Sequence, residues 1–293
     1  MRVALGMTVS ILKLRIGSFV ALAAVVGILT GGATLGPVEA LVFAVAVLGA
    51  SGAAGAFNQY LERDSDRLMV RTRNRPFAKG TLKAGPIWPV TFSALLAASL
   101  LMAWSVGGTL ATVLVFFGAA TYGLVYTVLL KKRTVWNVVI GGAAGSFAVL
   151  AGAAAAAPET GPAIGTVPVL LATVLFLWTP PHFWSLAAAR SEDYRDAQVP
   201  MLPVVTEPEF WGPTIFSHVA ALVALSFLPL FFGMGVVYGL FAAAGGLPFL
   251  RASWRLMRKP DRQRAMSTFR YSLLQFALLS LGVILDEGVR WAL

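Results

Sequence analysis

The chain has 293 residues, of which 58% are hydrophobic and 12% charged, and its mean hydropathy is +0.78. A soluble domain carries about a quarter charged residues, so this composition excludes a soluble globular protein. The absence of cysteine excludes disulfides, thiolate catalysis and cysteine-ligated metal sites. The formal charge of +10 lies in short loops between apolar runs, which is typical of membrane topology and argues against nucleic acid as a partner.

Nine segments are long and apolar enough to cross a bilayer, or nearly so. In chain order they are 16–33, 37–61, 86–105, 109–130, 137–157, 165–189, 212–232, 234–250 and 270–292. Only Gly233 and its neighbours separate the seventh segment from the eighth, so one kinked or re-entrant element would also fit there. The sequence therefore predicts an all-α, polytopic membrane protein: a single domain, 1–293, that forms a bundle of nine transmembrane helices.

The loops between these segments alternate between basic and nearly uncharged. Of the 23 Lys and Arg residues, 22 fall on one side of the membrane and only Arg290 falls on the other. By the positive-inside rule the amino terminus is cytoplasmic and the carboxyl terminus is outside. Nine of the thirteen acidic residues share the basic side, so we expect polar chemistry at the cytoplasmic mouth of the bundle.

An acidic stretch follows the second segment. Asn58, Glu62 and Asp66 are spaced four residues apart, so on a helix they form one stripe from which Asp64 points away. Carboxylates close to lipid are costly unless a cation compensates them, and Mg²⁺ prefers oxygen ligands and phosphate. The basic loop that comes next suits phosphate oxygens; its cations include Arg71, Arg73, Arg75 and Lys79. This combination predicts a magnesium–diphosphate site, and the alternative is helix-end charges that pair with one another.

A second acidic stretch, 192–196, follows the sixth segment. It could face the first and hold a second Mg²⁺, so that two ions clamp one diphosphate. The alternative is that Glu192 and Asp196 pair with Arg190 and Arg195. Further cations, Lys131, Lys132 and Arg133, follow the fourth segment at the same depth, one and two turns after Tyr126 and Tyr122. Topology alone would also place cations there.

Both histidines of the chain lie inside predicted spans. His182 follows Pro180 and Pro181, which would bend the helix, and His218 lies in the middle of the seventh segment. An intramembrane imidazole could ligate heme iron or relay a proton. A satisfied core histidine is the alternative for each.

The pattern Asn58-x3-Glu62-x3-Asp66, followed by Arg71-Thr-x2-Arg75-Pro76, resembles the first acidic motif of the UbiA-type intramembrane prenyltransferases. Those are nine-helix proteins that use Mg²⁺ and a prenyl diphosphate. Three stretches, 58–80, 126–145 and 181–203, resemble the protoheme IX farnesyltransferase (heme O synthase) branch. The likeness covers about residues 10–290 in layout and is weak in the last three segments. This sequence departs from the pattern at Leu14, Glu62, Ser146, Thr179 and Gln198.

The resemblance implies a set of roles for these side chains. It implies Mg²⁺ ligands at Asn58, Glu62, Asp66, Asp193 and Asp196, of which the first four are the catalytic set. It implies diphosphate contacts from Arg71, Arg75, Lys79, Lys131 and Tyr126, and a heme contact from His182. The substrates would be farnesyl diphosphate and protoheme IX, at the cytoplasmic side of a bacterial inner membrane, with a downstream heme A synthase or terminal oxidase as a candidate partner. A quinone precursor or a chlorophyllide-like acceptor stays open, as does a transporter.

Overall fold

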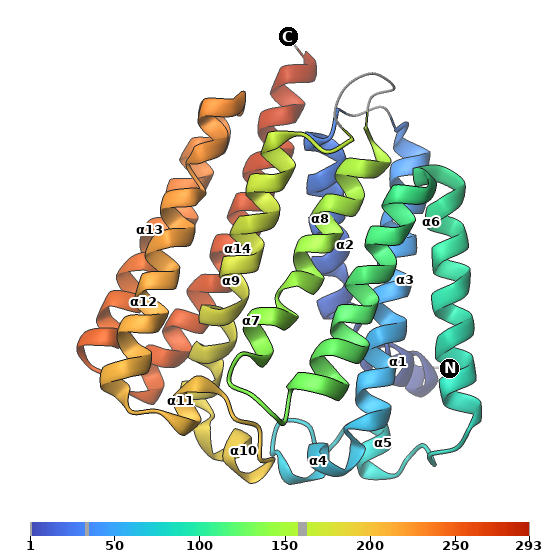
Figure 1. The fold of residues 1–293 in the computed structure, drawn as a ribbon, viewed down its shortest axis with the longest axis vertical. Helices are drawn as coiled ribbons and strands as arrows, with labels where there is room; N and C mark the ends of the chain where they lie inside the picture. The colour runs from blue at the N-terminus through green and yellow to red at the C-terminus, as the bar shows by residue number, and fades with distance from the viewer. Residues whose placement is uncertain (1, 33–34, 158–162, 293) are drawn as a thin grey trace.

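The computed structural model describes residues 2–32, 35–157 and 163–292, and its side chains from residue 6 onward. All regular structure in these residues is helical, as predicted. Seven helices are long and apolar enough to cross a membrane, which identifies a multi-pass membrane protein. They run upright and side by side in Figure 1. They are α3 (Pro37–Leu61), α6 with η1 (Ile87–Ala120, Thr121–Leu130), α7 with α8 (Asn137–Gly141, Ala143–Ala155), α9 (Thr166–Ala189), α12 with η2 (Pro208–Leu225, Leu228–Phe232), α13 (Val236–Arg258) and α14 (Arg262–Ala292). A shorter apolar helix, α2 (Leu14–Thr30), joins them.

The stretch 87–130 is continuous in its helical hydrogen bonding but is not one straight rod. Gly108 has φ 72° and ψ −173°, a non-helical conformation that glycine adopts without a Cβ clash. Figure 1 shows this stretch folding back on itself at the upper end of the bundle. The break predicted at 106–108 is therefore a sharp reversal, and the segments 86–105 and 109–130 form two neighbouring rods.

The last two spans are longer than predicted. Gly233, with φ 103°, separates two helices of spanning length, so the re-entrant alternative for 212–250 is wrong. The eighth span continues past residue 250 to Arg258, and the ninth begins at Arg262 instead of residue 270. Hydropathy marks where a chain leaves the apolar layer, whereas helical hydrogen bonding continues beyond it. Arg251 and Arg255 consequently lie on a helix and not in a loop.

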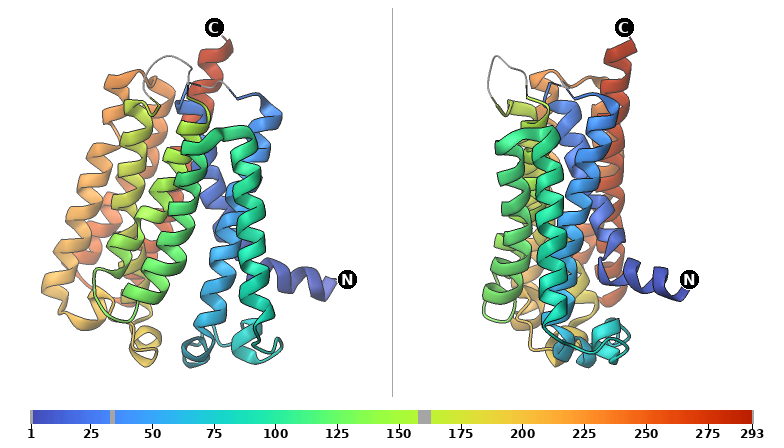
Figure 2. Two further views of the ribbon diagram at one scale, coloured as in Figure 1. Left: turned by 45° about the vertical axis from the view of Figure 1, so that its right-hand side comes forward. Right: turned by 90° about the vertical axis from the view of Figure 1, so that its right-hand side faces the viewer.

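Five short helices were not predicted, because each is shorter than the roughly 11 residues over which a helical pattern of apolar residues can be recognised. The first, α1 (Arg2–Ile11), runs across the direction of the bundle (Figure 2). The others gather at one end of the bundle (Figure 1). They are α4 (Arg63–Leu68), α5 (Pro76–Lys79), α10 (Ser191–Asp196) and α11 (Leu202–Val205).

Helices α2 and α8 pack with their backbones in contact. A Cβ added to Gly27 would lie 2.0 Å from the carbonyl oxygen of Val149, and one added to Gly152 would lie 1.9 Å from that of Ala24. Small residues at such crossings allow van der Waals packing between helices that share a lipid environment. This contact fixes α2 against the middle of the bundle.

At the end of the bundle opposite the short helices α4, α5, α10 and α11, a side chain of α14 caps the start of α13. The Asp286 carboxylate accepts hydrogen bonds from the backbone N–H groups of Gly235, at 2.6 Å, and Tyr238, at 3.1 Å. The first N–H groups of a helix have no partner inside that helix, so a carboxylate from a neighbouring helix satisfies two of them. Asp286, one of the two buried acids of the last predicted span, therefore has a structural partner.

Candidate active site

Polar side chains converge where α3 ends. Asn58, Glu62 and Asp66 are all buried. Although α3 ends at Leu61, the Glu62 N–H still bonds the Asn58 carbonyl, at 2.9 Å, and the Asp66 N–H bonds the Glu62 carbonyl, at 2.7 Å. The chain thus keeps helical spacing into α4, and the expected stripe faces inward. Asp64 points away as expected: its side chain is 72% exposed and pairs with Arg67.

Each member of the stripe is held by a cation from another part of the chain. The two Asp66 oxygens lie 2.9 and 2.8 Å from Arg75 Nη1, and Glu62 Oε2 lies 2.6 Å from Lys131 Nζ. Lys13 Nζ donates to Asn58 Oδ1 at 2.5 Å. Charge-assisted bonds of this kind are strong in a water-poor site, and the two ion pairs also compensate the buried carboxylates of Asp66 and Glu62.

The pKa of two of these groups reflects this balance. Burial alone would raise the pKa of the Glu62 carboxyl, but the charge and hydrogen bond of Lys131 bring it below its ordinary value. Burial lowers the pKa of the Lys13 ammonium well below its ordinary value, and the neighbouring Arg75 adds to that shift.

Lys13 was not among the predicted site residues. Its only signal was its place before Leu14, where this sequence departs from the family pattern.

The π-helix η1 and the residue that follows it carry four polar side chains of the site: Tyr122, Tyr126, Thr127 and Lys131. In an α-helix, residues five positions apart point about 140° apart. In a π-helix the hydrogen bond runs to the residue five positions back, so each turn is wider and such residues lie closer to one face. The Lys131 N–H accordingly bonds the Tyr126 carbonyl. This turns Thr127 toward the side of Tyr122, and Lys131 toward the side of Tyr126.

These side chains contact the stripe and its cations directly. The Asn58 amide donates to Thr127 Oγ1 at 2.9 Å, and Lys13 Nζ donates to the Tyr122 hydroxyl at 3.0 Å. The Lys131 ammonium lies 5.7 Å from the centre of the Tyr126 ring, and the two tyrosine rings stack at 5.7 Å. Thr127 and the π-helix were not predicted from the sequence.

The second acidic stretch meets the first loop through Asp193, which is 8% exposed. Asp193 Oδ1 accepts a hydrogen bond from the Val70 N–H at 3.2 Å, and Oδ2 is buried without a hydrogen-bond partner among the described residues. Asp196 is exposed, and so are Arg71 and Lys79 of the basic loop. The structure therefore brings Asn58, Glu62 and Asp66 together with Arg75 and Lys131. It ties Asp193 to the first loop through Val70, and it leaves Asp196, Arg71 and Lys79 exposed.

The donor chemistry of this site fits a divalent cation. Four oxygen-bearing side chains, Asn58, Glu62, Asp66 and Asp193, belong to it, and the unpartnered oxygen of Asp193 is a ligand of the type that Mg²⁺ prefers. Within residues 2–32, 35–157 and 163–292, no three His, Asp or Glu side chains are placed to share one ion. The basic side chains of Lys131 and Arg75 instead neutralise two of the acids.

An apolar cavity of about 170 Å³ lies beside the polar cluster. Tyr122 lines it, and its other walls are mostly small or apolar side chains of α2, α3, α6, α8 and α9. Thr179 and Phe183 contribute from α9. A polar site that opens beside an apolar chamber suits a ligand with a charged head and a hydrocarbon tail.

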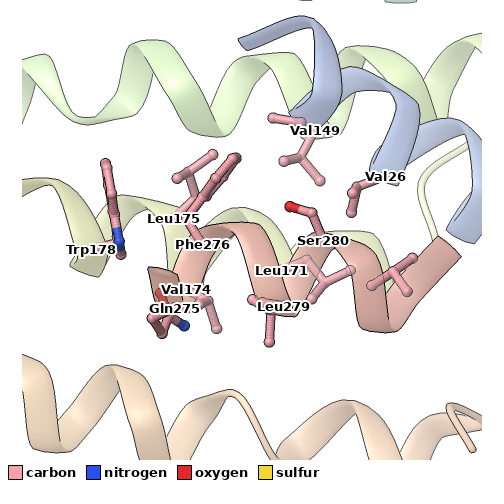
Figure 3. Close-up of a pocket in the computed structure, with 12 residues that line it drawn as sticks. Val26, Val149, Leu171, Val174, Leu175, Trp178, Gln275, Phe276, Leu279 and Ser280 are labelled. Carbon is pink, nitrogen blue, oxygen red and sulfur yellow. The ribbon is translucent and has the colours of Figure 1, made fainter. Parts of the chain in front are cut away.

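His182 belongs to α9, and its side chain faces α14. Its ring stacks on Trp178, with centroids 4.2 Å apart, and packs against Phe269, at 4.7 Å. Its Nδ1 hydrogen-bonds Ser272 Oγ at 2.7 Å, which leaves Nε2 for any ligand. Trp178 also lines a cavity of about 20 Å³ (Figure 3), which has room for little more than water. His218 is partly exposed, with Nδ1 lying 2.9 Å from the Thr214 carbonyl oxygen.

The chain is similar over nearly its whole length to proteins of known class. It is 51% identical to protoheme IX farnesyltransferase 2 of Paramagnetospirillum magneticum, covering 94% of this chain and 95% of that one. It is 40% identical to protoheme IX farnesyltransferase of Microcystis aeruginosa, over 87% and 81% of the two chains.

Two solved structures share the fold at low sequence identity. A digeranylgeranylglyceryl phosphate synthase superposes with a TM-score of 0.78 at 16% identity, over 97% of this chain and 98% of that one. A UbiA homologue from Archaeoglobus fulgidus, bound to GPP and Mg²⁺, superposes with a TM-score of 0.69 at 17% identity, over 95% and 99%. The model of the UbiA prenyltransferase family matches residues 18–279. The chain belongs to the UbiA prenyltransferase family.

Proposed function

We propose that the chain is a protoheme IX farnesyltransferase, which makes heme O from protoheme IX and farnesyl diphosphate. The observation that carries this proposal is 51% identity, over 94% of the chain, to a relative of that name. Membership of an enzyme family argues against the transporter considered from the sequence. The product would pass to a downstream heme A synthase or terminal oxidase.

The buried polar cluster is the proposed diphosphate site. Asn58, Glu62, Asp66 and Asp193 would hold Mg²⁺, with Asp196 at the rim, and the ion would neutralise and orient diphosphate oxygens. Arg75 and Lys131 would turn from the acids to the leaving pyrophosphate, and this stabilises the charge that develops there. Tyr126, Arg71 and Lys79 would complete the contacts.

The apolar cavity would take the farnesyl chain. Breaking the carbon–oxygen bond of farnesyl diphosphate leaves an allylic cation, and walls from α2, α3 and α8 would shelter it from water. A vinyl carbon of protoheme would form the new carbon–carbon bond. Water would then add to the remaining cation and lose a proton, which gives a hydroxyethylfarnesyl group.

We also propose nine membrane crossings for a single domain, with the amino terminus and the site on the cytoplasmic side of a bacterial inner membrane. The reversal at Gly108 and the apolar helix α2 support nine crossings over seven. The bias of 22 basic residues to one side supports the orientation.

Mass spectrometry of pigments tests this function. Membranes that contain the protein, given heme, farnesyl diphosphate and Mg²⁺, should yield heme whose mass is increased by one farnesyl group and one hydroxyl group. Asp66→Asn should lower the rate at least about 100-fold, since a charge that stabilises the reacting complex is lost. Asp64→Asn should retain the normal rate, because Asp64 lies two residues away and is exposed. Prenylation of another acceptor but not of heme would overturn the acceptor, and near-normal turnover by Asp66→Asn would overturn the site.

The heme contact has a separate readout. Protein purified with heme should show a Soret band that His182→Ala loses and His218→Ala keeps, because Ser272 orients the His182 ring. A band that survives in His182→Ala would remove this residue from the acceptor site without touching the diphosphate site.

A further inference from the structure

A basic cavity of about 940 Å³ opens between the end of α13 and the start of α14. Five cations line it: Arg251, Arg255, Arg258, Lys259 and Arg264. Neither Asp nor Glu is among its lining residues. The nearby Asp261 carboxylate already pairs with Arg264. The cavity is therefore strongly positive, and the proposed catalytic residues are not among those that line it.

The spacing of these cations is unfavourable without a bound anion. Arg251 and Arg255 lie four residues apart on α13, where like charges repel across a helix face, and Lys259 follows directly after the end of the helix at Arg258. All three side chains are exposed, and no carboxylate among the described residues forms an ion pair with them. The helix dipole favours cations in the last turn of α13, but it does not account for Arg251, two turns earlier.

The rim of the cavity is apolar and aromatic. Leu247 and Trp254, which are 56% and 47% exposed, lie on α13, and Tyr271 lies opposite on α14. The Arg258 guanidinium lies 5.9 Å from the Trp254 ring centre, a cation–π contact that holds this charge against the rim. Tryptophan and tyrosine are enriched at the boundary between lipid chains and headgroups.

We propose that this cavity binds the headgroup of an anionic phospholipid. Arg251, Arg255 and Lys259 would contact the phosphate, and the acyl chains would run along Leu247 and Trp254. Basic pockets between transmembrane helices suit such headgroups. Soluble phosphate shares the phosphate chemistry but would make no use of the apolar rim. The site is independent of the proposed prenyl transfer.

Native mass spectrometry of the detergent-solubilised protein tests the proposal. The protein is titrated with phosphatidylglycerol, with phosphatidylcholine of the same chains, and with inorganic phosphate. Arg255→Gln/Lys259→Gln should weaken phosphatidylglycerol binding about 30-fold, since each cation near an anionic surface contributes about one fivefold step. Lys83→Gln/Arg133→Gln removes two exposed cations outside the cavity and should leave binding unchanged.

Three outcomes would overturn the proposal. Equal binding of the two lipids would show that the headgroup charge is not recognised. Equal loss in both double variants would show a general charge effect in place of a site. Displacement of phosphatidylglycerol by inorganic phosphate at equal concentration would identify a soluble ligand.

Discussion

Among the residues that the structure describes, Asp193 is the acid with a carboxylate oxygen that is itself buried and has no hydrogen-bond partner. Glu62 and Asp66 are compensated by Lys131 and Arg75, whereas Asp193 has only one hydrogen bond, from a backbone N–H. A buried anion with a free oxygen is costly, and a bound cation removes that cost. We therefore expect the Mg²⁺ concentration that the enzyme needs to depend strongly on this side chain.

Asp193→Asn should raise the Mg²⁺ concentration for half-maximal activity by about tenfold, a change typical of weakened metal binding. Asp196→Asn, three residues later at the exposed rim, should change it less than about threefold. Magnesium titrations of initial rate measure both values. Equal shifts in the two variants would show that the whole acidic stretch acts through its charge and that Asp193 is not a direct ligand.

Some residues of the site could be foreseen and others could not. The stripe Asn58, Glu62 and Asp66 follows from helical periodicity, which the local sequence encodes. Lys13 and Thr127 reach Asn58 across 45 and 69 positions of the chain. Such contacts depend on how helices pack, and a single sequence carries no local pattern for them.

At the scale of elements, η1 sets the register of the site. Thr127 Oγ1 donates to the carbonyl of Tyr122, five residues earlier, and accepts from Asn58. This one hydroxyl therefore links the π-helical ladder to the acidic stripe. Its removal should loosen Asn58 without changing the charge of the site.

Thr127→Val should lower kcat/KM about tenfold, the effect of losing one buried hydrogen bond at a binding site, about 1.4 kcal/mol. Thr112→Val in the same rod is the matched control, because the Thr112 hydroxyl bonds the Gly108 carbonyl and the residue is only partly buried. Initial rates with farnesyl diphosphate measure both. Unchanged kinetics in Thr127→Val would show that the π-helix does not position Asn58.

The contact between α2 and α8 is the second element-scale feature with a measurable consequence. Gly152→Ala should destabilise the protein by about 1–3 kcal/mol, because its Cβ would overlap the Ala24 carbonyl and force the helices apart. Gly288→Ala, where nothing lies within 4 Å, should be neutral or slightly stabilising. Reversible unfolding in mixed micelles compares them. A neutral Gly152→Ala would mean that the two backbones separate at no cost.

Hydropathy located the long helices and the ends of only some of them. α3 runs over 37–61 as predicted, and α9 runs over 166–189 against a predicted 165–189, with Gly165 and Arg190 at its ends. α13 and α14 extend beyond their apolar parts. The π-helix η1 has the apolar composition of an ordinary α-helix, so hydropathy cannot distinguish the two helix types. Helix type and length beyond the membrane depend on tertiary contacts that composition does not report.

For the whole molecule, the lack of cysteine offers a direct test of orientation. In intact cells, an impermeant maleimide applied from outside should label Trp291→Cys and spare Arg133→Cys. The native Trp291 side chain is 65% exposed, so a cysteine there should be accessible. The reason is that basic loops stay in the cytoplasm. The unsubstituted chain provides the background. The reverse pattern would invert the topology, and labelling of both positions would rule out an odd number of crossings between residues 133 and 291.

The cap that Asp286 places on α13 can form only after α14 has been synthesised. The N–H group of Gly235 is synthesised 51 residues before this carboxylate, a delay of about 3–10 seconds at roughly 5–20 residues per second. During that interval α13 carries open N–H groups at its start, which a bilayer does not tolerate cheaply. We expect the nascent α13 to remain near the translocon until α14 arrives, so that the two helices leave it as a pair.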